Sequence, residues 1–406
     1  MIRIPTERYT SADYAARELA EMWPQVWVLA CTLDHVAQPG DVFEHRIGPY
    51  SALVVRGDDG ELRAFQNHCR HRGNTLCEGS ASGLTELRCG YHSWTWDLRG
   101  RLRTVPSRKD FGPLRNEDLP LVAARVDTWG PLVFVNLDPA GPTLAEYLQG
   151  MPEDIAWLGV DDFRCVATVA TPVQANWKVV VDGFSETYHL QGLHPEMLPS
   201  VDDVNTPQRI WGHVSASWQD YGTPSPRLHD PAMTSDNSVW ASFVATQGAR
   251  VGLDEPDDLD GDGPVRDRIA ERIRKHNAAA GVDLSRFDTQ QLLRLNQYNL
   301  FPNTTVTVFP DLLGVLTARP GPTPDTAEFV LLHFERAAGP NAPRTLAVDL
   351  TMTPEEADIG LILNQDVSVV AGVQRGVAQP GCTHLTLSDE ECRIANTHRL
   401  LDSYLL

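Results

Sequence analysis

Residues 68–94 read HCRHRGNTLCEGSASGLTELRCGYHSW and contain two pairs of side chains that commonly bind metals. One residue separates Cys69 from His71, and two residues separate Cys89 from His92. Seventeen residues lie between the two pairs, so two short loops can each offer one thiolate and one imidazole to a single inorganic centre.

Three interpretations of these four residues compete. Zinc binds two cysteines and two histidines tetrahedrally, but the cysteines usually share one loop and the histidines the other. Loops that mix the two residue types suit instead a cluster of two irons, in which thiolates hold one iron and imidazoles hold the other. Buried cysteines and surface histidines without a metal are the third interpretation, which four ligand-type residues at this spacing disfavour.

The sequence around this motif predicts a small all-β module from about Gly40 to Asp138. Short apolar runs alternate there with glycine and proline turns. Residues 51–65, SALVVRGDDGELRAF, have the pattern of a strand, a tight turn and a second strand. The run GPLVFVNLDP at 130–139 predicts another strand near the end of the module.

The rest of the chain mixes helices and strands. Residues 7–30 carry apolar side chains at three- and four-residue steps, which predicts a helix. Helical patterns return at 143–158 and at about 355–376, and a final helix follows Ser388, which has Glu391 in a capping-box position. Strands are predicted in CVATVATPVQ, NTTVTVFP, LLGVLTARP, AEFVLLHFER and RTLAVDLTMTP.

A second group of candidate ligands lies in residues 176–196, NWKVVVDGFSETYHLQGLHPE. His189 and His194 are five residues apart, which is about 140° around an ideal helix, so they do not share one straight helical face. Gly192 and Pro195 allow the chain to leave the helix, so that both imidazoles can turn inward. Taken alone, such a histidine pair is more often structural than metal-binding.

Both groups of residues carry the same family resemblance. Residues 68–94, with Arg72–Gly73 and Tyr91–His92 beside the ligand pairs, resemble the Rieske [2Fe–2S] motif of the aromatic ring-hydroxylating oxygenase α subunits. Asn176–Lys178 and Glu186–His194 resemble the mononuclear-iron motif of the same family. The resemblance extends over nearly the whole chain, from the N-terminal helix to the closing helix.

Two histidines and one carboxylate on one face of an iron leave positions open for dioxygen. Asp366 is the candidate carboxylate, because it is the only charged residue between Ile359 and Gln374 and matches the position in the family's pattern. A lone carboxylate in so apolar a run is costly unless a metal or a partner compensates it. The alternatives are an Asp366 that faces solvent on the polar side of its helix, or another nearby carboxylate as ligand, namely Glu356 or Asp358.

The resemblance implies one Rieske [2Fe–2S] cluster and one mononuclear Fe(II) per chain. Imidazole in place of thiolate raises the reduction potential of such a cluster, which lets it accept electrons from a ferredoxin or a flavin donor. The implied ligands are Cys69 and Cys89 for one iron of the cluster, His71 and His92 for the other, and His189, His194 and Asp366 for the mononuclear iron.

Glu186, the predicted catalytic residue, lies three residues before His189 and matches the family's bridging carboxylate. The resemblance implies that it accepts a hydrogen bond from an iron-ligand histidine and another from a cluster histidine of the neighbouring subunit. Such a link fixes the tautomer of the ligand and offers an electron path. The sequence departs from the family at Ser93, where glycine is usual, and at Gly183, where many members have an asparagine close to the iron.

The implied fold is α+β, with an all-β Rieske [2Fe–2S] domain inserted in a helix-grip (START/Bet v 1-like) catalytic domain. Its predicted extents are residues 39–140 for the Rieske domain and 141–406 for the catalytic domain. Residues 1–38 are expected to form an N-terminal helical segment that packs on the catalytic domain.

The implied function is that of the terminal oxygenase component of a multicomponent Rieske non-haem iron mono- or dioxygenase. We expect it to use O2 and electrons from NAD(P)H, delivered by a separate ferredoxin and/or flavin reductase, because the chain has no flavin, NAD or plant-type ferredoxin motif of its own. The expected substrate is a largely apolar, aromatic or cyclic small molecule that is hydroxylated or oxidatively demethylated, as in aromatic hydrocarbon catabolism. The expected assembly is a homotrimer or α3β3.

Two other classes of function compete with the oxygenase. A Rieske electron-transfer protein needs only the β module, and a helix-grip ligand-binding protein needs no intact iron site. Counting irons separates them, since an oxygenase holds three per chain and either alternative holds two.

Composition and charge narrow the expected partners. Forty-two per cent hydrophobic and 22% charged residues are typical of a folded globular protein. A net charge of −20 disfavours nucleic acid and anionic membranes as partners. The N-terminus shows no secretory pattern, and seven thinly scattered cysteines suit a reducing compartment, so a cytoplasmic location is expected.

Charge is distributed unevenly within the β module. Residues 63–115 contain ten basic and four acidic side chains, an excess that contrasts with the acidic chain as a whole. We expect part of this excess, including Arg101 and Arg103, to form a docking surface for an acidic electron donor.

Overall fold

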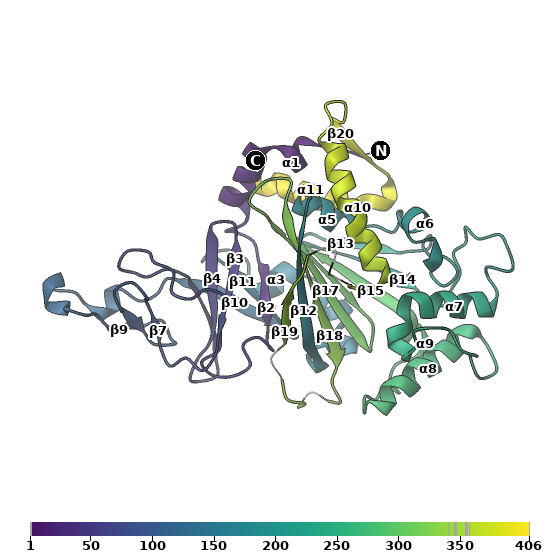
Figure 1. Cartoon of the computed structure of the whole chain (residues 1–406), viewed down its shortest axis with the longest axis horizontal. Coiled ribbons are helices and arrows are strands. Elements are labelled where there is room, and N and C mark those ends of the chain that lie inside the picture. Colours follow the sequence, from purple (N-terminus) through teal and green to yellow (C-terminus); the bar gives the residue numbers. More distant parts are fainter. Residues whose placement is uncertain (1, 340, 345–346, 354–355, 357, 406) are drawn as a thin grey trace. The chain divides into compact units, whose positions relative to one another are not determined.

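The computed structural model describes residues 2–339, 341–344, 347–353, 356 and 358–405. The chain divides into two compact units, and the segment that forms the first unit interrupts the second along the sequence (Figure 1). The β unit comprises Arg17–Tyr147 and Pro343–Ala347, and the α+β unit comprises Met1–Ala16, Leu148–Ala342 and Val348–Leu406.

The β unit is built on a seven-stranded antiparallel sheet with the order β2-β11-β10-β5-β4-β3-β6. The predicted hairpin in residues 51–65 is confirmed, because β4 and β5 pair with Val54 opposite Ala64. The strands are β2 (Val28–Thr32), β3 (Val42–Ile47), β4 (Tyr50–Arg56), β5 (Leu62–Gln66), β6 (Ser80–Ala81), β10 (Ala123–Trp129) and β11 (Leu132–Asn136).

A three-stranded antiparallel sheet completes the β unit and places the metal-binding motif on a packed base. Its strands are β7 (Leu87–Arg88), β8 (Thr95–Trp96) and β9 (Leu102–Thr104). Trp96 is fully buried, and Cys69 and Cys89 belong to the same hydrophobic core. The first residue of each ligand pair is therefore anchored in the core of the unit.

The predicted helix over residues 7–30 is wrong in its second half. The structure has α1 (Glu7–Thr10), α2 (Ala12–Arg17) and a π-helical turn at Glu18–Met22. Pro24 follows, and since proline has no N–H to continue the helical ladder, the chain leaves the helix there. Val28–Thr32 instead forms β2, which pairs with β11, so the boundary between the units lies at residue 16 rather than at the predicted residue 38.

The α+β unit contains an eight-stranded sheet with the order β13-β14-β15-β16-β17-β18-β12-β19. All its neighbouring strands are antiparallel except β12 and β19. The strands are β12 (Phe163–Val173), β13 (Gln208–Trp211), β14 (Val214–Asp220), β15 (Arg294–Leu300), β16 (Thr304–Val308), β17 (Leu312–Pro320), β18 (Ala327–Arg336) and β19 (Val348–Thr351). The five strands predicted from sequence are among them.

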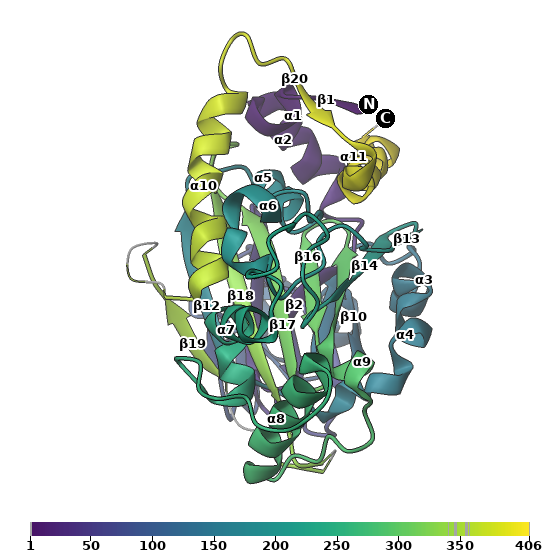
Figure 2. The same cartoon turned by 90° about the vertical axis from the view of Figure 1, so that its right-hand side faces the viewer.

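Besides α1 and α2, the described residues form further helices, and several of those in the α+β unit lie along its eight-stranded sheet or at its ends. Figure 2 shows α10 running along the sheet, with α7, α8 and α9 together at one end of it. Side chains of these last three helices form one hydrophobic core with the start of β15. The helices are α3 (Leu144–Leu148), α4 (Met151–Asp154), α5 (Trp177–Gly183), α6 (Leu190–Leu193), α7 (Asp236–Gln247), α8 (Val265–Ala279), α9 (Thr289–Leu293), α10 (Leu361–Val377) and α11 (Cys392–Leu405).

The two termini of the α+β unit meet in a small sheet, where β1 (Ile2–Pro5) pairs with β20 (His384–Leu387). The predicted capping box is confirmed, because Ser388 and Glu391 bond each other's backbone N–H groups before α11. The predicted helix at 355–376 begins later than expected, at Leu361 after Gly360, and residues 354, 355 and 357 lie outside the described part of the chain.

The predicted α+β fold class is confirmed, with an all-β unit inserted in a unit of mixed helix and sheet. Across the described residues, no helix is both long enough and apolar enough to cross a membrane.

Candidate metal centres and cavity

The three predicted mononuclear ligands converge in the α+β unit. His189 immediately precedes α6, His194 immediately follows it, and Asp366 lies on α10. One ligand atom from each residue lies within 4.8 Å of the other two. Nε2 of His194 is 2.8 Å from Oδ1 of Asp366, and Nε2 of His189 is 3.7 Å from the same oxygen. The side chain of Asp366 is only 14% exposed, so it does not face solvent.

The local sequence explains why the two histidines point to one place. Helix α6 is a single turn, and His194 takes a non-helical backbone conformation at its end. Pro195 then starts a separate 3-10 turn, Pro195–Met197. The expected departure from the helix is thus confirmed, and it brings the two imidazole rings to 5.1 Å between centroids at 77°.

Glu186 holds His189 in one orientation. Its Oε1 lies 2.6 Å from Nδ1 of His189, and its Oε2 accepts the backbone N–H of His189 at 3.0 Å. A carboxylate at this distance accepts a hydrogen bond from Nδ1–H, which leaves Nε2 without a proton and free to act as a metal ligand. Glu186 therefore bonds to Nδ1 of His189, the ring nitrogen opposite the candidate ligand atom, and does not belong to the group of three.

Gln365 holds His194 in one orientation, as Glu186 holds His189. The sequence did not predict this role of Gln365. Its Oε1 lies 2.6 Å from Nδ1 of His194, so Nε2 of that ring faces Asp366. Burial disfavours the charged imidazole, but the bonds to Asp366 and Gln365 outweigh burial and raise the pKa of His194 above its ordinary value. In the sequence, the only feature that could have pointed to Gln365 is its position next to Asp366. That position alone does not distinguish Gln365 from any other polar residue of a helix.

The alternative carboxylates lie elsewhere. Asp358 accepts hydrogen bonds from Asn364 and from the backbone of Gly360 near the start of α10. Glu356 bonds to Thr353. Both carboxylates are engaged in local turns, and neither belongs to the group formed by His189, His194 and Asp366.

These residues fit a divalent metal of the iron type. Protein nitrogen and oxygen ligands lie about 2.0–2.2 Å from such a metal, so two ligand atoms at right angles are about 3 Å apart. The distances of 2.8 and 3.7 Å to Oδ1 of Asp366 lie around that value. Two imidazoles with fixed tautomers and one carboxylate are also the donors of non-haem iron oxygenases.

The four predicted cluster ligands lie on two loops with the same hydrogen-bond pattern. The N–H of Cys69 bonds to the carbonyl of Asn74, and the N–H of Gly73 returns to the carbonyl of Cys69. The second loop repeats this with Cys89, Trp94 and Ser93. Each loop thus presents a cysteine at its buried base and a histidine nearer its tip, as the spacing predicts.

The conformation of the second loop explains why glycine is usual at residue 93. Ser93 has a positive φ of 58°, and the equivalent Gly73 has a φ of 76°. A left-handed conformation costs a residue with a Cβ roughly 1–2 kcal/mol, whereas glycine adopts it freely. Ser93 adopts this conformation despite its cost, and it is not one of the four candidate ligands.

The side chains of the two loops fit a cluster of two irons. The sulfurs of Cys69 and Cys89 interact with each other, and burial opposes ionisation, but the backbone N–H groups of Tyr91 and His92 hold the pKa of Cys89 below its ordinary value. The rings of His71 and His92 lie 4.6 Å apart. Within the described residues, the buried Nδ1 of His71 has no hydrogen-bond partner, as expected of a nitrogen atom that binds a metal.

A large cavity opens on the group of three in the α+β unit. It has a volume of about 540 Å³ and lies between the sheet and α10. A second cavity of about 360 Å³, lined mainly by valine and other apolar side chains, borders the same residues from the side of α5 and α11. The cavities share Gly183, Phe184, Glu186, His189 and Asp366.

Gly183 leaves room beside the candidate iron site. A Cβ at this position would meet no heavy atom within 4 Å. The space that many family members are expected to fill with an asparagine is therefore open, and no amide is available there from residue 183.

Comparison with known proteins decides the family. Residues 160–406 match the family model of the ring-hydroxylating α subunit catalytic domain, and residues 26–124 match the Rieske [2Fe–2S] domain. The chain belongs to the ring-hydroxylating α-subunit family. Its two domains are those of Rieske oxygenases, which bind a [2Fe–2S] cluster and a mononuclear iron.

Curated relatives of this α subunit differ in substrate. It is 29% identical over 216 residues to the carnitine monooxygenase oxygenase subunit of Acinetobacter baumannii, covering 53% of this chain and 57% of the relative. It is 32% identical over 213 residues to the glycine betaine monooxygenase oxygenase subunit of Chromohalobacter salexigens, covering 50% and 46%. It is 29% identical over 289 residues to the benzene 1,2-dioxygenase subunit alpha of Pseudomonas putida, covering 67% and 60%. The matched region thus spans about half the length of these relatives.

Solved structures share the fold over the whole chain. A quaternary ammonium Rieske monooxygenase superposes with a TM-score of 0.71 at 20% identity, covering 99% of this chain and 95% of the other. Naphthalene 1,2-dioxygenase with bound indole superposes with a TM-score of 0.70 at 17% identity, covering 100% and 92%.

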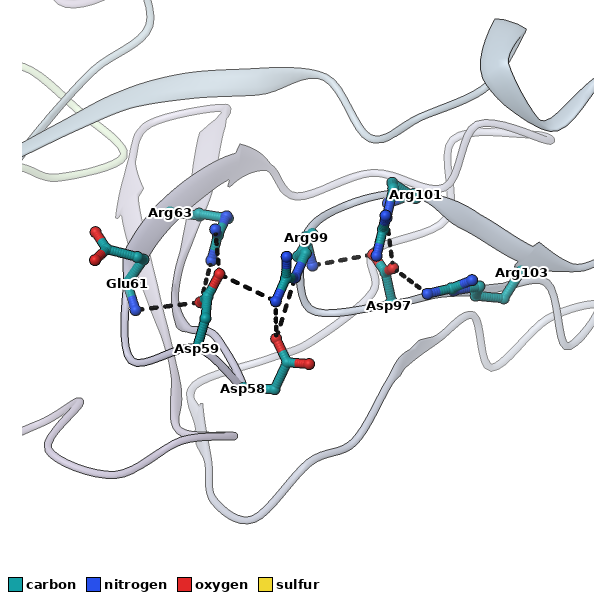
Figure 3. Close-up of polar contacts among 8 residues, drawn as sticks. All are labelled: Asp58, Asp59, Glu61, Arg63, Asp97, Arg99, Arg101 and Arg103. Carbon is teal, nitrogen blue, oxygen red and sulfur yellow. Dashed lines mark hydrogen bonds and ion pairs between the residues drawn. The ribbon is translucent and has the colours of Figure 1, made fainter.

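The basic excess expected on the Rieske domain is partly neutralised. Figure 3 shows Arg63, Arg99, Arg101 and Arg103 in a ladder of ion pairs with Asp58, Asp59 and Asp97. Asp58 and Asp59 lie in the turn between β4 and β5, before residues 63–115, and the fold brings them beside Arg99. The expected docking role of Arg101 and Arg103 stays a prediction, and both guanidinium groups share Asp97 at 2.8 and 2.7 Å.

Proposed function

We propose that this chain is the terminal oxygenase component of a multicomponent Rieske non-haem iron oxygenase. It inserts oxygen from O2 into a small, largely apolar molecule, with electrons from NAD(P)H that a separate ferredoxin or flavin reductase delivers. The observation that carries this proposal is the position of His189, His194 and Asp366 on the wall of a cavity of substrate size. A pure electron carrier has no use for either feature.

The chain's own residues prepare the site for this reaction. When bound, the cluster passes single electrons and the mononuclear iron activates dioxygen. Glu186 and Gln365 hold the protons of their histidines at Nδ1, so both Nε2 atoms stay available. The apolar walls around Phe184 and the valines of α10 exclude water beside the reacting carbon, which limits side reactions.

We infer the class of substrate from the lining of the cavity rather than from the names of the relatives. Two of those names specify quaternary ammonium compounds, and a third specifies benzene. A quaternary ammonium group is recognised by open aromatic faces. In the larger cavity, the ring of Phe309 is covered by the guanidinium of Arg250 at 3.8 Å, and Tyr221 lies edge-on to Phe309 at 5.3 Å between ring centroids. The largely apolar walls of both cavities favour an uncharged substrate, and oxidative demethylation of a quaternary ammonium compound is the second candidate.

Electrons are proposed to reach the iron through Glu186 from the cluster of a neighbouring subunit, in a homotrimer or α3β3 assembly. The structure of the quaternary ammonium relative gives insights into inter-subunit electron transfer in that protein. In this chain, Tyr91 beside His92 and Tyr188 beside His189 are each about half exposed. Exposed aromatic side chains next to both histidine motifs suit surfaces that another subunit covers.

A product screen tests the proposed reaction. The holoenzyme, a surrogate ferredoxin and reductase, NADH and O2 are incubated with panels of neutral aromatic, cyclic and quaternary ammonium compounds. We expect oxygenated products from neutral compounds, with one or two 18O atoms from labelled O2. Formaldehyde or another aldehyde from the quaternary ammonium panel alone would establish the second candidate instead.

A further inference from the structure

One face of the eight-stranded sheet forms the floor of the 540 Å³ cavity, and a row of mostly polar residues crosses it. In the register of β14 to β18, each member of the row lies directly opposite the next member on the neighbouring strand. Directly opposed residues of antiparallel strands point to the same face of a sheet. The row consists of Ser217, Gln297, Thr307, Gly314 and His333, and all of these except Ser217 line the cavity.

The row lies one step along the strands from the segment that carries Glu186. Asn299 follows Gln297 by two residues on β15, so both side chains are on the cavity face. The amide of Asn299 donates to the carbonyl of Phe184 at 3.0 Å. Two strand residues correspond to roughly 7 Å. The polar row and the group of three therefore border the same cavity, with the Asn299 contact between them along β15.

A buried arginine fixes the amide of Gln297 in one orientation. Arg393 of α11 is 1% exposed, and its Nη1 donates to Oε1 of Gln297 at 2.7 Å. A guanidinium only donates hydrogen bonds, so the oxygen of the amide, and not its nitrogen, must face Arg393. The positive charge on the oxygen side also polarises the amide in the direction that strengthens its N–H donors.

The two N–H bonds of Gln297 are left for a molecule in the cavity. Gln297 keeps 6% of its surface and is part of the cavity wall. Among the described residues, its Nε2 has no hydrogen-bond acceptor, and this nitrogen is not one of the unpartnered polar atoms that the protein encloses. A donor that keeps surface on a cavity wall and has no protein acceptor is available to a ligand.

Gln219 offers a contrast on the same floor. It lies on β14, is 5% exposed and also lines the cavity, but within the described structure no hydrogen bond fixes its side chain. Such an amide can turn either its oxygen or its nitrogen toward a ligand, so it does not discriminate donors from acceptors. Gln297 does discriminate, because its oxygen is already bound to Arg393.

We propose that Gln297 determines specificity by donating from its amide nitrogen to an oxygen acceptor of an otherwise apolar substrate. This inference rests on the proposed function, since it names the polar feature of the substrate that the same cavity takes. A carbonyl oxygen is the acceptor best suited to this donor, and a molecule whose polar group only donates gains nothing from it.

Binding of two matched pairs of probes to the holoenzyme tests the inference without turnover. Acetophenone accepts a hydrogen bond, and α-methylstyrene has the same shape without an acceptor. Indole donates a hydrogen bond, and indene has the same shape without a donor. Dissociation constants are measured anaerobically by calorimetry in the wild type and in Gln297→Glu.

Glutamate at residue 297 keeps an oxygen for Arg393 and replaces the free NH2 group by a second oxygen. The ratio of the α-methylstyrene Kd to the acetophenone Kd is therefore expected to fall at least about tenfold. The ratio of the indene Kd to the indole Kd is expected to rise by about fivefold or more, because the new oxygen accepts the indole N–H.

Gln208→Glu is the matched control. Oε1 of Gln208 also accepts from Arg393, at 3.2 Å from Nε, but Gln208 is not part of the cavity wall. This variant places the same new charge against Arg393 and should leave both ratios within about twofold. If Gln297→Glu does not fold, Gln297→Met removes the donor without adding an acceptor, and only the acetophenone ratio is expected to fall. An unchanged acetophenone ratio in the Gln297 variant that folds, or an equal fall in Gln208→Glu, would overturn the inference.

Failure of this inference is separable from failure of the proposed function. Normal product formation with no dependence of the binding ratios on Gln297 rejects the donor role alone. A clear dependence of the ratios without any product in the reductase-coupled screen rejects the oxygenase reaction and leaves the donor role standing.

Discussion

Replacement of Glu186 by glutamine is expected to leave three irons per chain and to lower product formation in a single turnover about 100-fold. Glutamine keeps an oxygen that can accept a hydrogen bond from Nδ1–H of His189, the contact that the structure shows at 2.6 Å for Glu186. The tautomer, and with it the ligand atom Nε2, is therefore preserved. What the variant lacks is the negative charge that strengthens the hydrogen bonds on both sides of the proposed bridge.

The decisive measurement for this variant uses protein reduced in advance and then exposed once to O2 and substrate. Cluster reduction is followed by its visible absorbance, iron is counted, and product is quantified. Near-wild-type product would show that Glu186 is not the electron path. Loss of one iron per chain would place Glu186 among the ligands and would reopen the assignment of Asp366.

Replacement of Asp366 by alanine is expected to remove the mononuclear iron and to leave the cluster intact. Among the described residues, Asp366 supplies the carboxylate of the group of three, whose ligand atoms lie within 4.8 Å of one another, so its loss leaves two neutral donors. Such a site holds a divalent metal weakly. Gln365→Leu should have a graded effect, a 10- to 100-fold loss of metal affinity, because His194 then loses the partner that fixes its Nδ1 proton.

Asp358→Ala is the matched control, since it removes a carboxylate from the start of the same helix that bonds only to neighbouring turn residues in the described structure. Iron content by plasma emission spectrometry should fall by one per chain in Asp366→Ala and stay unchanged in Asp358→Ala. The reverse pattern would show that the third ligand was assigned to the wrong carboxylate.

Features encoded by short sequence spacing were predictable. The two ligand loops follow from Cys-x-His and Cys-x2-His, and the departure of the chain at His194 follows from Gly192 and Pro195. Asp366 was predictable over a long distance for a different reason, because a single charge in an apolar helix needs compensation.

Features that depend on contacts between distant segments were not predictable. Arg393 and Gln297 are 96 residues apart, and nothing near either residue indicates their contact. The acids that neutralise Arg99 lie about 40 residues before it, so counting charges along a segment overstated the basic surface. The helical pattern of residues 7–30 also continued through Pro24 into a buried strand, because a fully buried strand shows no alternation.

The central claim is that one chain holds a two-iron cluster and a separate iron at His189, His194 and Asp366. Counting iron and acid-labile sulfide in the anaerobically purified wild-type protein tests it most directly. The account predicts three irons and two sulfides per chain. Two irons with two sulfides, after reconstitution with excess Fe(II), would contradict it and would indicate an electron carrier or a ligand-binding protein.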